Sequence, residues 1–323
     1  MTFLNAAADH EEADPGPLES IAFSGLASGP KLIVLGAVHG NETCGPLAIA
    51  RMIDDIRSGR VLIRRGEVAF VPVANPRAYR QNTREGERNL NRDLYEKPVA
   101  RNYEDRIGNR LCALLRRHEV LLDIHSFSNP APPFVFFGPQ DNAGELEPFR
   151  HGQAERDFAA CLGTDVLIHG WLDIYARLIE ARQQLELPPL ALTEGFGTTE
   201  FMRFAGGYGV TLECGVHDDP NGPEIGYRAI RNALAQLGMV DEPRPAPRRA
   251  TVIDMNDLVI CEREGDRLDG EWRTCDPVEA GAVVARRADG SAVQAQRDGF
   301  IVFPNANAKP GEGICYLGVA SGR

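Results

Sequence analysis

The sequence lacks any apolar run long enough to cross a membrane as a helix. It also lacks a signal-peptide pattern, because its first twenty residues are acidic and broken by prolines rather than basic and then apolar. Basic residues are few, with 35 Lys and Arg against 46 Asp and Glu and a net charge of -11. This balance argues against nucleic acid and anionic membranes as partners. We therefore expect a cytoplasmic protein with a disordered segment at residues 1–20.

Cysteine motifs are absent too, since the seven cysteines form no CxxC pair and follow no regular spacing. Their odd number does not suit a disulfide framework. We expect reduced, mostly buried thiols rather than disulfides or a thiolate zinc site. The sequence shows no internal repeat and no low-complexity tract.

Two kinds of segment alternate along the first 237 of the 323 residues. Short apolar runs typical of buried strands lie at 31–38, 67–73, 119–124, 134–137 and 208–213. Stretches with helical period lie between and after them, at 43–57, 104–117, 154–162, 172–186 and 224–237. This alternation predicts an α/β domain over residues 21–240, with a largely parallel or mixed sheet.

The texture of the sequence changes after residue 240. Residues 241–250, "DEPRPAPRRA", contain three prolines and five charges, which is typical of a linker. Residues 251–323 then show short alternating runs separated by "ADG", "DG" and "KPGEG" turns. This pattern predicts a smaller, β-rich C-terminal domain.

Three side chains at predicted strand ends are candidate metal ligands. The run 31–38 stops at His39, and Glu42 follows three residues later. Open α/β sheets place their ligands at the carboxyl ends of strands, which favours a site here. His125 ends another apolar run, and Asp123 shares its strand face and can fix its tautomer. Two histidines and one glutamate suit a catalytic zinc ion, whereas the alternative for His125 is a hydrogen-bonded core histidine.

A second candidate feature is a dense set of arginines in an acidic protein. Five of them recur at spacings of three or four residues: Arg77, Arg80, Arg84, Arg88 and Arg92. A solvated basic helix face would give the same spacing, but the asparagines and the glycine among them disfavour a continuous helix. Because guanidinium groups suit carboxylates, the segment fits an anion-binding loop. Further along, Glu213 ends the apolar run before it and is a candidate general base.

In order, these pieces resemble the succinylglutamate desuccinylase/aspartoacylase family of carboxypeptidase A-like zinc hydrolases. The matching motifs are "HGNE" (39–42), "ANPRA" (74–78), "NLNRD" (89–93) after Arg84, "DIH" (123–125) and "TLECG" (211–215). The resemblance covers residues 30–240, and a C-terminal β domain also fits the family. It implies a zinc-carboxypeptidase-like mixed sheet flanked by helices.

The resemblance also implies roles for individual residues. His39, Glu42 and His125 are expected to bind one Zn²⁺ per chain. Glu213 is expected to act as general base, and Arg84 to polarise the scissile carbonyl.

Four further residues match substrate-binding positions of the family: Asn91, Arg92, Arg203 and Tyr316. The first two are expected to grip a substrate carboxylate. The resemblance therefore implies a zinc-dependent amidohydrolase acting on linear amides, which deacylates a small-molecule N-acyl amino acid. It leaves open the acyl group and the amino acid of the substrate. It also leaves open the oligomeric state, for which a homo-oligomer is one option.

Three alternatives stay open at this point. A zinc carboxypeptidase acting on short peptides would use the same ligands and base. A non-enzymatic binding protein would be expected to lack a ligand or Glu213. A cysteine hydrolase built on Cys44 or Cys214 would need a histidine base, and the metal already claims His39.

Overall fold

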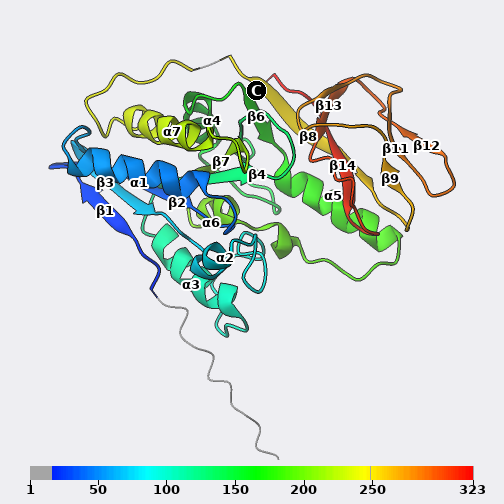
Figure 1. The fold of residues 1–323 in the computed structure, drawn as a ribbon, viewed down its shortest axis with the longest axis horizontal. Coiled ribbons are helices and arrows are strands. Elements are labelled where there is room, and N and C mark those ends of the chain that lie inside the picture. Colours follow the sequence, from blue (N-terminus) through cyan, green and yellow to red (C-terminus); the bar gives the residue numbers. More distant parts are fainter. Residues whose placement is uncertain (1–16, 248, 323) are drawn as a thin grey trace, which may run out of the picture.

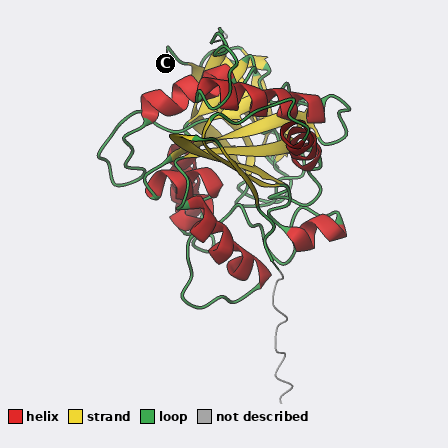
Figure 2. Ribbon diagram, turned by 90° about the vertical axis from the view of Figure 1, so that its left-hand side faces the viewer, coloured by secondary structure: helices red, strands yellow, loops and turns green. Residues whose placement is uncertain are grey.

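The computed structural model describes residues 17–247 and 249–322. Within them, one mixed sheet of eleven strands has the order β1-β3-β2-β4-β7-β5-β6-β8-β14-β13-β10. The sheet runs through the molecule from β1 at one end to the C-terminal strands at the other (Figure 1). Helices lie on either side of the first part of this sheet (Figure 2). The predicted α/β class is confirmed.

The elements up to residue 240 are mostly those that the periodicity predicts. The strands are β1 (Ile21–Ser24), β2 (Ala27–Gly36), β3 (Arg65–Val71), β4 (Val120–Phe127), β5 (Phe134–Phe136), β6 (Val166–His169) and β7 (Tyr208–Val216). The helices are α1 (Cys44–Arg57), α2 (Pro76–Gln81), α3 (Tyr103–Leu115), α4 (Gly152–Cys161), α5 (Trp171–Gln184), α6 (Thr198–Phe204) and α7 (Gly222–Gln236), with a 3-10 turn at Leu192–Gly195. The elements that periodicity misses are short, namely β1, β6, α2, α6 and this turn. Four to seven residues give too few repeats for a period to show.

Alternate side chains of β2 enter two different cores. Leu32 and Val34 pack in a core that contains apolar residues of α1 and α7. Ile33 and Leu35 pack in the opposite core, beneath α3 and α6. Burial on both faces explains why this strand reads as a continuous apolar run.

The central strands bring their carboxyl ends to one edge. β3, β2, β4 and β7 are parallel neighbours, and His125 at the end of β4 pairs in register with Glu213 of β7. The loop after β2, which carries His39 and Glu42, leaves the sheet at the same edge. Residues that are 174 positions apart in the sequence are therefore neighbours here.

The C-terminal region is rich in strands, as expected. They are β8 (Thr251–Ile260), β9 (Arg267–Leu268), β10 (Pro277–Val278), β11 (Val283–Arg286), β12 (Ala292–Gln294), β13 (Gly299–Val302) and β14 (Gly313–Ala320). β8 runs parallel to β6 and antiparallel to β14, so the main sheet continues into this region. Division of the chain into two domains at 241–250 stays a prediction.

Three expectations from composition meet the structure in different ways. The seven cysteines are unpaired, and all but Cys275 are buried. Residues 1–16 of the predicted disordered segment lie outside the described part of the chain. No helix among the described residues is long and apolar enough to span a membrane.

Candidate metal centre and active site

The loop between β2 and α1 is shaped by close packing against α2. A Cβ atom at Gly40 would lie 2.0 Å from the carbonyl carbon of Ala78, so only glycine allows this approach. The Glu42 amide donates to the His39 carbonyl at 3.2 Å and closes the turn. The turn places the His39 and Glu42 side chains together at the sheet edge.

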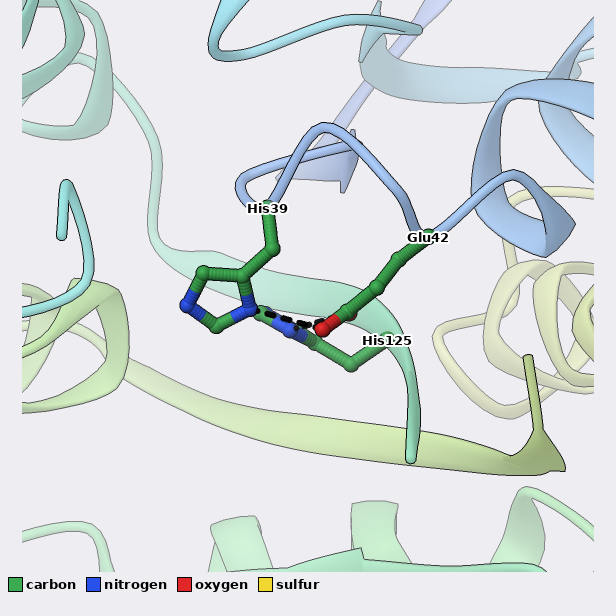
Figure 3. Close-up of side chains that lie close together, drawn as sticks. All are labelled: His39, Glu42 and His125. Carbon is green, nitrogen blue, oxygen red and sulfur yellow. Dashed lines mark hydrogen bonds and ion pairs between the residues drawn. The ribbon is translucent and has the colours of Figure 1, made fainter. Parts of the chain in front are cut away.

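The three predicted metal ligands form one buried cluster. Nδ1 of His39 lies 2.8 Å from Oε1 of Glu42, and Nδ1 of His125 lies 2.9 Å from Oε2 of the same carboxylate (Figure 3). One ligand atom from each residue lies within 4.8 Å of the other two. Two nitrogens and one oxygen at this separation suit a tetrahedral zinc ion with an open fourth position. These residues therefore fit the metal that the family implies.

Burial and mutual attraction set the charges of this cluster. Burial lowers the pKa of the His39 imidazole to about 4, against the attraction of Glu42. Burial acts on His125 in the same direction, but Asp123 and Glu42 outweigh it and raise its pKa well above the ordinary value. Burial alone would raise the pKa of Glu42, yet the two imidazoles hold it well below its usual range. Glu42 is thus ionised, as a metal ligand must be.

Each imidazole has a second polar partner behind it. Nε2 of His39 lies 3.0 Å from Oδ1 of Asn89. Nε2 of His125 lies 2.9 Å from Oδ2 of Asp123, in an ion-pair contact. Such partners fix the tautomer and leave Nδ1 free to ligate. The sequence predicts this position for Asp123, whereas no sequence pattern assigns it to Asn89.

Glu213 lies beside the cluster without a partner for its charge. Its Oε2 atom is buried and has no hydrogen bond to any described residue. Burial, and then the charge of Glu42, raise the pKa of Glu213 to about 8. Desolvation therefore gives this carboxylate the raised proton affinity that a general base needs.

All nine predicted site residues line one cavity of about 1080 Å³: His39, Glu42, Arg84, Asn91, Arg92, His125, Arg203, Glu213 and Tyr316. Of the five clustered arginines, only Arg84 and Arg92 reach it. Arg77 and Arg88 instead pair with the carboxylates of Glu87 and Asp105. The sequence thus identified where the side chains meet, while their roles stay predictions.

The part of the chain that carries the His–Glu–His cluster is similar to a known catalytic domain. Residues 28–129 match the family model of the succinylglutamate desuccinylase/aspartoacylase catalytic domain. This stretch is similar to that catalytic domain. The predicted resemblance is therefore confirmed, and the match includes His39, Glu42 and His125. No curated protein matches the chain.

Several solved structures share the fold over nearly the whole chain. The ectoine utilization protein EutE (DoeB) from Ruegeria pomeroyi has 21% identity and a TM-score of 0.69, over 94% of this chain and 89% of its own. A succinylglutamate desuccinylase/aspartoacylase from Rhodobacter sphaeroides has 17% identity and a TM-score of 0.70, with the same two coverages. A succinylglutamate desuccinylase from Vibrio cholerae has 17% identity and a TM-score of 0.68, over 91% of this chain and 82% of its own.

The two arginines that line the cavity have different surroundings. Nη1 of Arg84 lies 3.3 Å from Oε1 of Glu42, and about half of the Arg84 side chain is exposed. Arg92 makes no ion pair with a carboxylate of the described residues. Its Nη1 donates to the Asn91 carbonyl, and its guanidinium lies 5.0 Å from the ring centre of Trp171. Burial and the nearby Arg84 lower the pKa of Arg92. Its positive charge is therefore poorly compensated within the protein, and a bound anion would stabilise it.

Arg203 is the predicted substrate residue whose environment differs most from expectation. Its guanidinium contacts three carboxylates, those of Glu147, Glu155 and Glu200. Nη2 also donates to the Gly209 carbonyl. All five N–H groups of Arg203 therefore have acceptors within the protein.

Aromatic residues form a wall of the cavity that the sequence did not reveal. Phe136 stacks on Phe303 with ring centres 5.5 Å apart, and Trp171 and Tyr316 lie at the edges of this pair. Phe136 belongs to β5, whereas Phe303 follows β13. No local signal marks such residues, because they are separated by more than 160 positions and come together only through β8 and β14.

Proposed function

We propose that this protein is a zinc-dependent deacylase that hydrolyses the amide bond of a small N-acyl amino acid. The match of residues 28–129 to the succinylglutamate desuccinylase/aspartoacylase catalytic domain supports deacylase chemistry. One observation carries the proposal further: Glu213 and Arg92 line the same cavity as the His–Glu–His cluster. Among the described residues, Oε2 of Glu213 has no hydrogen-bond partner and Arg92 has no carboxylate partner. A general base, a metal site and an anion site in one cavity fit an amide substrate that bears a carboxylate.

Each residue then has a task in the reaction. Zinc at this centre would supply Lewis-acid chemistry and lower the pKa of a water molecule to about 7. Glu213 takes the proton of the attacking water and passes it to the leaving amine. Arg84 donates to the oxyanion that develops on the carbonyl oxygen. Arg92 and the Asn91 amide hold the carboxylate and orient the scissile bond.

The identity of the substrate needs an experiment, because the similar structures include an ectoine utilization protein and a succinylglutamate desuccinylase. The cavity of about 1080 Å³ also leaves room for a short peptide, which favours a zinc carboxypeptidase as the second candidate. The cytoplasmic location and the absence of a nucleic-acid partner stay predictions from composition.

The test is a hydrolysis panel with the zinc-loaded protein. It contains N-acetyl, N-succinyl and longer N-acyl amino acids beside short peptides with a free carboxyl end. We expect turnover of one group of N-acyl amino acids, its loss after treatment with a chelator and its return with zinc. Trimming of peptides with no turnover of N-acyl amino acids would replace the proposal by the carboxypeptidase. Chelator-resistant turnover would remove zinc from it.

A further inference from the structure

One unbroken chain of polar contacts joins the outer nitrogens of the two metal-binding imidazoles. From His39, Nε2 contacts Oδ1 of Asn89 at 3.0 Å, and the same oxygen accepts the Asn91 amide at 2.8 Å. Oδ1 of Asn91 accepts the Thr198 amide at 2.9 Å. The Thr198 hydroxyl donates to Oδ2 of Asp123 at 2.5 Å. That oxygen lies 2.9 Å from Nε2 of His125.

We propose that Asn89 and Thr198 are positioning residues that couple the carboxylate clamp of Asn91 and Arg92 to both histidines of the metal centre. The proposal rests on the function proposed above. Neither residue was among the site residues that the sequence indicated. In this arrangement, metal binding and the bound geometry of the clamp stabilise each other.

The directions of the hydrogen bonds support this arrangement. A backbone amide can only donate, so the Asn91 amide fixes which side-chain atom of Asn89 is the oxygen. That oxygen can only accept, and His39 must therefore carry its proton on Nε2. Its Nδ1 is then free to ligate.

The same reasoning fixes the Asn91 side chain. Because Oδ1 of Asn91 accepts the Thr198 amide, Nδ2 is the group left to donate into the cavity that Asn91 lines. The orientation of the clamp amide thus depends on the first residue of α6.

Thr198 and Asp123 form the other arm of the chain of contacts. Both side chains are fully buried. Oδ2 of Asp123 is shared by the Thr198 hydroxyl and His125, while Oδ1 has no hydrogen-bond partner among the described residues. Without the Thr198 hydroxyl, the Asp123 carboxylate loses the neutral hydrogen-bond donor that fixes its orientation. His125 then loses a fixed acceptor behind it.

The test measures zinc affinity by competition with a chelator in the folded full-length protein, without any turnover. We expect Thr198→Val and Asn89→Leu to weaken zinc binding by about 10–100-fold, as loss of such outer partners typically does. Thr198→Ser restores the hydroxyl and should bind zinc like the wild type. The matched control is Thr164→Val, a buried threonine whose hydroxyl donates to the Val166 carbonyl away from the cavity.

A second measurement follows the clamp itself by amide hydrogen exchange. Zinc should slow exchange in the segment 86–95 of the wild type, and this slowing should be absent in Asn89→Leu. If Asn89→Leu does not fold, Asn89→Asp replaces it, because aspartate keeps an acceptor for His39. A carboxylate makes His39 more basic, so this variant should bind zinc about tenfold more tightly than the wild type.

The proposal would be overturned if Thr198→Val and the Asn89 variant that folds, Asn89→Leu or Asn89→Asp, both bind zinc with wild-type affinity. Equal losses in Thr198→Val and Thr164→Val would do so as well, since both would then reflect general destabilisation. A protein that binds zinc as expected but hydrolyses no N-acyl amino acid would instead refute only the proposed function.

Discussion

Replacing Arg92 by lysine keeps the positive charge of the clamp but removes its planar fork. In the structure the guanidinium lies over Trp171, lines the cavity and has no carboxylate partner among the described residues. A lysine would retain one charge-assisted contact to a substrate carboxylate and lose the second. One such hydrogen bond contributes about 1.5–3 kcal/mol. A loss of about 2 kcal/mol corresponds to a fall of roughly 30-fold in kcat/KM.

The assay compares kcat/KM for an N-acyl amino acid and for its C-terminal amide, in the wild type and in Arg92→Lys. We expect the wild type to prefer the acid and the variant to lose most of that preference. Arg80→Lys is the matched control, because Arg80 belongs to the same arginine cluster but is exposed and outside the cavity. Equal use of acid and amide by the wild type would show that no carboxylate is recognised, and the reasoning on Arg92 would fail.

Three further outcomes follow from the site and the fold. His125→Ala should lose most of its zinc in metal analysis, because one of three ligands is gone; stoichiometric zinc in this variant would contradict the ligand assignment. Glu213→Gln should keep zinc and fold but lose 10²–10⁴-fold in kcat, and a loss below about tenfold would show that Glu213 is not the base. Asp266→Asn tests the C-terminal region: burial alone would raise the pKa of Asp266, but N–H groups of Glu262, Ala288 and Arg287 hold it below its ordinary value. Because its pKa is lower in the folded state, the ionised carboxylate stabilises the fold at pH values above its unfolded pKa of ~3.9. Urea unfolding should therefore give Asp266→Asn a lower free energy of unfolding than the wild type at pH 7, and this difference should shrink below about pH 4.

The three residues of the candidate metal centre could be predicted to lie together because each is at or near the end of a local pattern. An apolar run that stops at a histidine marks a strand end, and the parallel strands β2, β4 and β7 bring such ends together. The turn at Gly40 could not be predicted in this way. Its cause is the backbone of α2 against Gly40, a contact that no local pattern encodes.

Residues that act through contacts between distant segments could not be predicted in this way. Asn89 meets His39 across fifty positions, and Thr198 meets Asp123 across seventy-five. Asparagine and threonine are common in loops and at helix starts, so their type carries little information about such a role. Only the tertiary arrangement identifies their partners.

Arg203 shows the opposite case, in which a matching position has a different environment. The family resemblance suggested a substrate contact, yet its N–H groups are all engaged within the protein. Glu155 is fully buried and also accepts the amides of Gly138 and Gly209, so it is the fixed partner of this charge. Glu147 and Glu200 then remain as two further carboxylates at the cavity.

This end of the cavity is therefore acidic, and the substrate side chain that it accepts should be neutral or cationic rather than acidic. Burial raises the pKa of Glu147 to about 7, against the attraction of Arg203. The carboxylate is then neutral below this pH and charged above it. We expect the ratio of kcat/KM for Nα-acetylornithine to that for N-acetylaspartate to exceed one and to rise between pH 6 and pH 8. The rise should vanish in Glu147→Gln and persist in the exposed control Glu145→Gln. Preference for N-acetylaspartate at both pH values would contradict this reasoning. It would indicate that Arg203 exchanges a glutamate partner for the side-chain carboxylate of the substrate.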